Sequence, residues 1–552
     1  MSAGGGRRQL LAGAAAVAVV VLVALWLVRP AFHGLVMLVY ARPSLVEALV
    51  VGAVGVAAVR SLLAPDAGAL SRALRALQND EGQAAGRELR AASGRRLLLA
   101  VLVGAVTLAL VLAIPVLGGA YAQEHVARTL PVESTDSLPG INADYPRILP
   151  QSVATQYAEN SLQYPRYRLA VGDIAVRNGT PYWSFGLAPD GAVNTLALTG
   201  KGASFVDMTT QQKRVDVVEE EMTVGFGVGL GSGGNVVSEY RWRLQKGEYL
   251  LRYEDPVMVE HDGDVYMAVP YVTYEHHVRL TPVPVVYTTP RWGGVALVSP
   301  DGGVEHLSPA AARDHPVLRG QRLVPFDLTR YYVESMRYSR GILNKWFVHE
   351  DELEVAPVPG EGNEQPFLVV TEDRGLQYFV AAEPYGQAQG IYQLWMFDAR
   401  TGAASRYRLP VESALMGPRK AANFVRKANA KTDWDRFTPS EPVPAVVGDR
   451  LYWQIRVVPT DSSGIAYTAF VAADSGDVYS FQTDAKIRAF LAGTIDGDQT
   501  DERPGGGDVA VVVVIRDESG QVVNRVNVTR GQTVEIRTAG NATRNRTTTA
   551  AG

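Results

Sequence analysis

The chain of 552 residues contains no cysteine. Disulfides, thiolate zinc sites, iron–sulfur clusters and a cysteine nucleophile are therefore excluded, and the usual indicator of redox compartment is missing. The sequence also lacks the Gly-x-Ser-x-Gly elbow, His-Glu-x-x-His, the Walker loop and Ser-x-x-Lys. These absences disfavour an enzyme without excluding one, and we expect no catalytic residue, no metal site and no cofactor.

Lysine is absent from the first 120 residues, which carry 11 Arg and 5 acidic side chains, a formal charge of +6. Subtraction from the chain totals of 53 basic and 57 acidic side chains leaves 42 and 52 for the rest, a formal charge of −10. Nucleic-acid binding needs clustered positive charge, so neither part indicates it. The length exceeds what one hydrophobic core organises, which predicts several structural units.

Three apolar runs dominate the N-terminal part: Leu10–Val28, Leu45–Leu63 and Leu97–Leu117. Each is close to the ~20 residues that a helix needs to cross ~30 Å of hydrocarbon. Residues 31–40, between the first two runs, are apolar but too short to cross, so we expect a re-entrant or interfacial segment. Residues 1–120 are thus predicted to be a membrane domain with about three transmembrane helices and the lipid bilayer as a partner.

The arginines predict the orientation of this domain. Loop 64–96 holds six Arg, and such loops stay on the cytoplasmic side. We therefore expect a multi-pass protein of the cell membrane with a cytoplasmic N-terminus and an extracytoplasmic domain after about residue 118. The start, Arg7-Arg8-Gln9, also resembles a twin-arginine export signal, but the apolar run is longer than a cleaved signal and no Ala-x-Ala stands at its end, directly before Arg29.

The remaining chain divides by composition. We expect a connector over 121–150, an α+β ectodomain with four hairpin repeats over 151–485, a linker over 486–508, a small β-module over 509–538 and a disordered tail over 539–552. In the β-module, residues 509–515, 521–528 and 532–537 have the pattern of three strands.

The ectodomain repeats one pattern four times. An apolar strand leads to a Gly- or Asp-containing turn, such as Asn178-Gly179 or Asp262-Gly263, and then to a strand centred on tyrosine. These turn residues supply the positive φ angles of tight hairpins, and alternating apolar residues give each strand one buried face. The aligned tyrosines are unevenly spaced, which argues against a propeller: they are Tyr182, Tyr266, Tyr378 and Tyr452.

Helical patterns precede at least three of these hairpins. Residues 152–163 and 327–343 each carry an apolar stripe, with Asp327 as the expected N-cap of the second, and Pro418 is suited to open a helix over 419–430. Each unit therefore reads as a helix on a small antiparallel sheet.

This order of elements, with a last strand that ends in Asp-x-x-Thr-Gly, resembles the PepSY family of small extracytoplasmic domains. The likeness covers about 60 residues, Leu376–Gly402 and Leu451–Phe481, and the whole chain is not matched. The resemblance implies a binding or inhibitory module of the cell envelope, and it carries over no catalytic residues.

Two sets of candidate site residues remain. Four Asn-x-Ser/Thr sequons are possible glycosylation sites in an organism that has the machinery: Asn178, Asn527, Asn541 and Asn545. Five aromatic residues are either core residues or a partner-binding surface: Tyr182, Trp183, Trp395, Tyr452 and Trp453. The adjacent pair His276-His277 points to opposite faces of a strand, which makes a shared metal improbable.

Three functions stay open on these grounds. The favoured one is a non-enzymatic, membrane-anchored cell-envelope protein whose ectodomain binds a peptide, a polymer or a protein partner. The alternatives are an extracytoplasmic hydrolase or its regulator, and an accessory subunit of a transporter or secretion complex. The ligand and the oligomeric state do not follow from the sequence.

Overall fold

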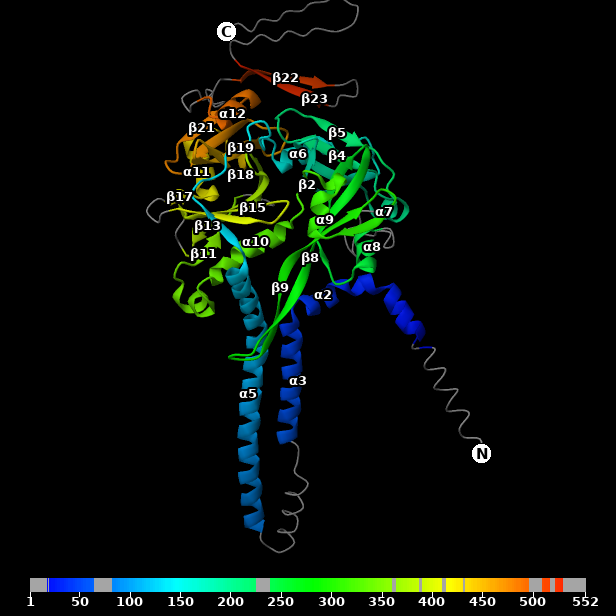
Figure 1. Cartoon of the computed structure of the whole chain (residues 1–552), viewed down its shortest axis with the longest axis vertical. Helices are drawn as coiled ribbons and strands as arrows, with labels where there is room; N and C mark the ends of the chain where they lie inside the picture. Colours follow the sequence, from blue (N-terminus) through cyan, green and yellow to red (C-terminus); the bar gives the residue numbers. More distant parts are fainter. Residues whose placement is uncertain are drawn as a thin grey trace, which may run out of the picture.

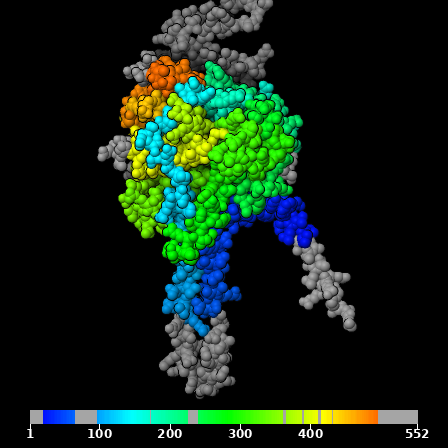
Figure 2. Space-filling view, in the orientation of Figure 1, coloured from blue at the N-terminus to red at the C-terminus, as the bar shows by residue number. Residues whose placement is uncertain are grey.

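The computed structural model describes residues 17, 19–63, 82–224, 239–359, 364–386, 390–409, 414–429, 432–495, 509–516 and 522–529. A globular body, defined here as residues 131–495, sits at one end of a pair of long helices (Figure 1, Figure 2). The body is built mainly of antiparallel sheets with helices packed on them, which agrees with the predicted α+β class.

Two N-terminal helices are long and apolar enough to cross a membrane: α3 (Pro43–Leu63) and the part of α5 (Gly82–Thr129) that runs from Arg96 to Thr129. They contain the second and third predicted runs. The described part of the first run forms a helix, Val19–Leu27, which is bent by 73° against Arg29–Ala41. The number of possible spans is therefore two, or three if this bent pair is one span.

The short apolar segment lies against the base of the body (Figure 1). It forms a 3₁₀ turn, η1 (Arg29–Phe32), and helix α2 (His33–Ala41). The carbonyl of Arg29 accepts a hydrogen bond from Tyr249 Oη at 2.8 Å, and the ring of Tyr40 packs edge-on against Tyr274. These contacts explain why the chain turns here instead of continuing the first helix.

Helices α3 and α5 pack through small residues. A Cβ added at Gly55 would lie 2.2 Å from Thr107 Cγ2, and one at Gly118 would lie 2.5 Å from Ser44 Oγ. Because glycine has no side chain, the two helix backbones can approach closely at these positions, as is usual for helix pairs in membranes.

Each of the four repeat units is a four-stranded antiparallel meander. The strands of the first unit are β2 (Tyr167–Arg177), β3 (Thr180–Pro189), β4 (Ala203–Asp207) and β5 (Val215–Val218). Those of the second are β7 (Val257–His261), β8 (Asp264–Arg279), β9 (Val285–Val298) and β10 (Val304–Leu307). Those of the third are β12 (Phe367–Thr371), β13 (Gly375–Pro384), β15 (Gln393–Asp398) and β16 (Ala404–Arg408). Those of the fourth are β18 (Phe437–Val447), β19 (Arg450–Pro459), β20 (Tyr467–Ala472) and β21 (Val478–Phe481).

Short strands extend these meanders. Strand β6 (Arg252–Tyr253) joins β8, and β11 (Leu353–Val355) joins β13. Strand β1 (Val132–Thr135), which follows α5, pairs in parallel with β16 and so ties the long helix to the third unit. Strands β14 (Gly390–Ile391) and β17 (Leu415–Met416) form a separate small pair.

The predicted hairpins are confirmed at all four positions. At the first turn, Asn178 has φ 49° and Gly179 has φ 83°, and at the second Asp262 and Gly263 have φ 55° and 94°. Two successive positive φ angles produce the tight turn whose twist matches that of the flanking strands.

A helix precedes each meander. The predicted helices are α6 (Gln151–Glu159), α10 (Phe326–Ser335) and α11 (Pro418–Ala428), and the sequence pattern did not predict α8 (Tyr240–Gly247). Two expectations for α10 were wrong. Asp327 lies in the first turn after the N-cap Pro325. The α-helix ends at Ser335, where 3₁₀ turn η3 (Met336–Tyr338) follows directly, and π-turn η4 (Asn344–Val348) comes only after a break in the helix.

The expected domain boundaries shift in two places. Helix α5 passes residue 120 and ends only at Thr129. The expected linker from 486 contains most of α12 (Asp484–Leu491), whose Ile487 and Phe490 are buried against the fourth sheet. Further short elements are α7 (Ala192–Ala197), α9 (Pro309–Asp314) and η2 (Pro316–Leu318).

Two of the three predicted C-terminal strands are present, as the pair β22 (Val509–Arg516) and β23 (Val522–Thr529). The third strand and the predicted tail lie outside the described residues.

Candidate functional site

A cavity of about 550 Å³ lies where the four units meet. Its walls come from α6 and the loop before it, from β2 and β3, from the loop between β6 and β7, from the start of α10, and from β12, β13 and β18. The lining includes residues of both charge signs: Arg147, Asp173, Arg241, Arg252, Glu254, Asp255, Arg322, Asp327, Glu364 and Glu441. Ionic groups are rarely enclosed unless they are paired, so each of these needs a partner.

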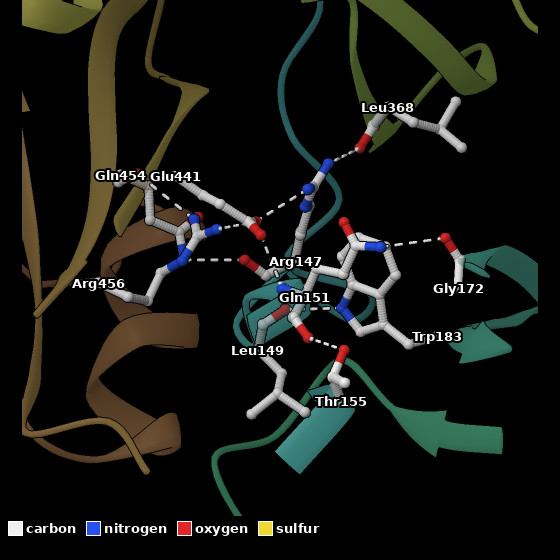
Figure 3. A network of polar contacts seen from close by, with 10 residues as sticks. All are labelled: Arg147, Leu149, Gln151, Thr155, Gly172, Trp183, Leu368, Glu441, Gln454 and Arg456. Carbon is white, nitrogen blue, oxygen red and sulfur yellow. Dashed lines mark hydrogen bonds and ion pairs between the residues drawn. The ribbon is translucent and has the colours of Figure 1, made fainter. Parts of the chain in front are cut away.

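Glu441 is the centre of the first buried charge network (Figure 3). Its Oε2 atom accepts hydrogen bonds from Arg147 Nη2 at 2.9 Å and from Arg456 Nη2 at 2.8 Å. Its Oε1 atom accepts the backbone N–H of Gln151 at 2.7 Å. The carboxylate therefore joins β18 and β19 of the fourth unit to the start of α6 in the first unit.

The backbone of β18 is distorted at this residue. The pairing of β18 with β19 shifts register between Ser440 and Val443, and Glu441 within this bulge has φ 41°. A bulge changes the direction in which a side chain points, and a left-handed backbone is costly for a residue with a Cβ. We interpret the distortion as the local cost of directing this carboxylate between two guanidinium groups.

Burial and charge act in opposite directions on this network. The Arg456 side chain is 0% exposed, and burial lowers the pKa of its guanidinium to about 10 in spite of Glu441. Burial alone would raise the pKa of Glu441, but the positive charges of Arg147 and Arg456 hold it below its ordinary value. Both groups are therefore ionised at neutral pH.

The second buried network joins the first, second and third units. Arg322 forms a two-pronged ion pair with Asp173 of β2, with its Nε atom 3.0 Å from Oδ1. Its Nη1 atom also donates to the hydroxyl of Tyr378 in β13 at 3.4 Å. Burial raises the pKa of Tyr378 to about 12, so this tyrosine remains a neutral donor, and it donates to the carbonyl of Val324.

Three of the lining residues carry a buried polar atom that no other described group of the protein satisfies. Within the described part of the chain, three buried polar atoms of the lining have no hydrogen-bond partner: Arg147 Nε, Arg252 Nε and Glu254 Oε1. An Arg252 nitrogen lies 3.5 Å from Glu254 Oε1, too far for a good charge-assisted bond. These three atoms are shielded from solvent, so a ligand would instead meet the exposed charged groups of the lining, which are Asp255, Asp327 and Glu364.

Glu254 is also the lining acid whose charge is most sensitive to pH. Burial, reinforced by the negative charge of Asp327, raises its pKa to about 7, although Arg322 and Arg252 favour the ionised form. The site therefore changes its net charge near neutral pH.

A second cavity of about 590 Å³ adjoins the first, because both are lined by Arg252, Asp327 and Glu364. Its other walls include Ser44 at the start of α3 and Gly119 of α5. The polar cavity thus continues from the middle of the body to its junction with the long helices.

The described lining of the first cavity contains no Ser, Thr, Cys, Lys or His. The arrangement therefore offers charged and aromatic groups for recognition and lacks the usual pairing of a nucleophile with a base. Among the residues that the structure describes, no group of three or more His, Asp or Glu is placed to hold a metal ion.

The predicted aromatic partner residues lie mainly inside the body. Trp395 and Trp453 are buried in the cores of their units, Tyr452 is 8% exposed, and Tyr182 is half-buried. Only Trp183 borders the cavity, where Arg147 lies over its ring at 5.1 Å. The structure therefore brings one of these five aromatic residues to the candidate site.

The remaining candidates are dispersed. Asn178 is exposed in the β2–β3 turn, Asn527 lies in β23, and Asn541 and Asn545 fall outside the described residues. The histidine pair separates as expected for a strand: His276 approaches the carbonyl of Tyr40, and His277 approaches Thr289 Oγ1.

Sequence reasoning singled out only one charged residue of the cavity, Asp327, and named it as a helix cap and not as a site residue. Arg322, Asp173 and Glu441 come from different units and carry no shared motif. One available signal was the position of an acid in an otherwise apolar stretch, as with Glu441 in Ser440-Glu441-Pro442-Val443. Comparison with known proteins adds no relative, since no family model, no curated protein and no solved structure matches the chain.

Proposed function

We propose that the protein is a membrane-anchored binding protein of the cell envelope, whose globular body lies outside the cytoplasm and binds a short peptide or similar zwitterionic molecule in the cavity between its four units. The observation that carries this proposal is a cavity of about 550 Å³ whose lining holds charged groups of both signs, among them Arg252, Asp327 and Glu364.

The composition of the lining supports this class of ligand. A free carboxylate matches the guanidinium of Arg252, and an amine matches Asp327, whose side chain lies in the exposed first turn of α10. Trp183 and Phe367 are aromatic members of the same lining. A volume of about 550 Å³ is in the range of small-molecule sites and suits a peptide of a few residues.

Membrane anchoring is supported by the two helices described above together with the arginines of loop 64–96. The second cavity, next to Ser44 and Gly119, extends the site toward the long helices that would anchor such a protein.

Binding is tested on the full chain in lipid nanodiscs by thermal shift and calorimetry. The probes are short peptides with free termini and the same peptides acetylated and amidated. We expect free peptides to bind, and Asp327→Asn or Arg252→Gln to weaken binding about tenfold, because each removes one charge-assisted hydrogen bond of ~1.5 kcal/mol.

The matched control is Asp314→Asn, an exposed acid at the end of α9 outside the cavity lining, which should bind like the unmodified protein. If blocked peptides bind as well as free ones, or if the control weakens binding as much as Asp327→Asn, the assignment of the cavity is wrong.

A further inference from the structure

The β8–β9 hairpin leaves the body and runs beside the two long helices (Figure 1). Its contacts with α3 follow the direction of that helix. Thr288 Oγ1 donates to the carbonyl of Ala41 just before α3, at 2.5 Å, whereas Val286, nearer the tip, donates its N–H to Glu47 Oε2 in the second turn at 2.9 Å. Hairpin residues closer to the tip therefore contact residues further along α3.

Val285 marks how far the paired part of the hairpin extends. It is buried in one cluster with Ala48 of α3 and Ile114 of α5. It also lies beside Gly118, where an added Cβ would be 3.6 Å from Val285 Cγ1. The register pairs Val285 with Arg279, so residues 280–284 form the tip beyond this level.

Helix α5 sets the outer boundary of the hydrocarbon. The run Leu97–Leu117 starts directly after Arg95-Arg96. Its length at 1.5 Å per residue is roughly 31 Å, which fills a hydrocarbon layer of ~30 Å if both arginines stay at the inner surface. Gly118 and Val285 then lie at the outer boundary, and two further strand residues carry the tip up to ~7 Å deeper.

The side chains of the tip suit lipid better than water. Leu280 is 70% exposed, Pro282 and Pro284 are exposed as well, and Val278 in the adjoining end of β8 is 64% exposed. Proline has no backbone N–H, so two of the five tip residues bring no donor that lipid would leave unsatisfied.

A neighbouring segment is consistent with a membrane surface at this level. Ile342 packs on the cluster around Val285, and the exposed apolar side chains of Leu343, Phe347 and Val348 follow it, together with Trp346. Tryptophan is enriched where a protein meets the membrane–water interface.

We infer that the tip of the β8–β9 hairpin, residues 280–284, is inserted into the outer leaflet of the bilayer and contacts lipid chains. The inference rests on the proposed membrane anchoring, and it adds a third contact that fixes the height and tilt of the body above the membrane.

The absence of cysteine makes the test direct. Single-cysteine variants of the full chain are labelled with an environment-sensitive fluorophore and placed in phosphatidylcholine vesicles that carry a nitroxide quencher either near the headgroups or near the chain ends. The positions are Leu280→Cys at the tip, Leu108→Cys on the exposed side of α5, and Val193→Cys, a 78% exposed apolar residue on α7 of the body.

We expect the label at position 280 to emit at shorter wavelength than the one at 193 and to lose most emission with the shallow quencher. The label at 108 should lose most with the deep quencher, and the label at 193 should be quenched by neither. Quenching at 108 without quenching at 280 overturns the hairpin insertion and leaves the anchor intact. Lack of quenching at 108 overturns the anchor itself, and the insertion with it.

Discussion

Glu254 is the cavity residue through which pH acts on this protein. The ordinary pKa of a glutamate is ~4.3, and burial raises that of Glu254 to about 7 in the folded chain. The protonated form is thus favoured by folding. Its contribution to stability is complete below about pH 4.3 and is lost as the pH rises through 7.

We therefore predict that Glu254→Gln makes the free energy of unfolding less dependent on pH between about 5 and 8. The side chain of Glu254 is only 11% exposed, so its ionisation should lower the free energy of unfolding of the unmodified protein by roughly 3 kcal/mol over this interval. The variant should lack this decrease. Urea unfolding at a series of pH values measures it. Asp255→Asn, at the exposed neighbouring acid, is the control, and an equal flattening by that variant would contradict the role of Glu254.

Glu239, the N-cap of α8, acts in the same direction, since burial raises its pKa to about 7 as well. The pH dependence of the Glu254→Gln variant should therefore be reduced but not abolished. Addition of Glu239→Gln is expected to reduce it further.

At the scale of the elements, the α3–α5 pair depends on glycine at the contact. A Cβ added at Gly104 would lie 3.8 Å from Val59 Cγ2, which is close enough for a disulfide between two introduced cysteines after small adjustments. By contrast, a side chain at Gly55 meets Thr107 and forces the helices apart, a type of overpacking that costs ~1–3 kcal/mol.

We predict that the double variant Val59→Cys/Gly104→Cys forms a disulfide on mild oxidation, seen as a mobility shift after cleavage of loop 64–96. Addition of Gly55→Leu should abolish the cross-link. Gly34→Leu is the matched control, because a Cβ at Gly34 of α2 meets nothing within 4 Å. A cross-link that survives Gly55→Leu would show that the two helices are held together by the body alone.

The elements also show what local sequence decides. The hairpins at Asn178-Gly179 and Asp262-Gly263 were predictable because two residues with positive φ determine such a turn by themselves. The last strand of each meander was not predicted, since β5, β10 and β21 are only four residues long and are defined by the strand they pair with.

At the scale of the whole molecule, the positions of the arginines and of the globular body together predict how the protein is oriented across the membrane. Four of the six arginines of loop 64–96 belong to the start of α5, which is the end of that helix away from the globular body (Figure 1). If arginine-rich segments stay in the cytoplasm, the body with its cavity lies outside.

This orientation is testable with a membrane-impermeant maleimide on intact cells that express Val193→Cys or Arg72→Cys. We expect labelling of position 193 on intact cells and of position 72 only after permeabilisation. The reverse pattern would place the body in the cytoplasm and contradict the proposed envelope function.

The sequence by itself determined the apolar helices, the four hairpins and the helices before three of them, because each depends on residues that are neighbours along the chain. Only the tertiary structure placed Arg322 beside Asp173 and Glu441 between Arg147 and Arg456. The ion-paired residues in these networks are up to 294 residues apart along the chain. The sequence alone does not distinguish a charged side chain that faces water from one that is buried beside a partner of opposite charge. The cavity, and with it the proposed site, therefore became visible only when the four units were packed together.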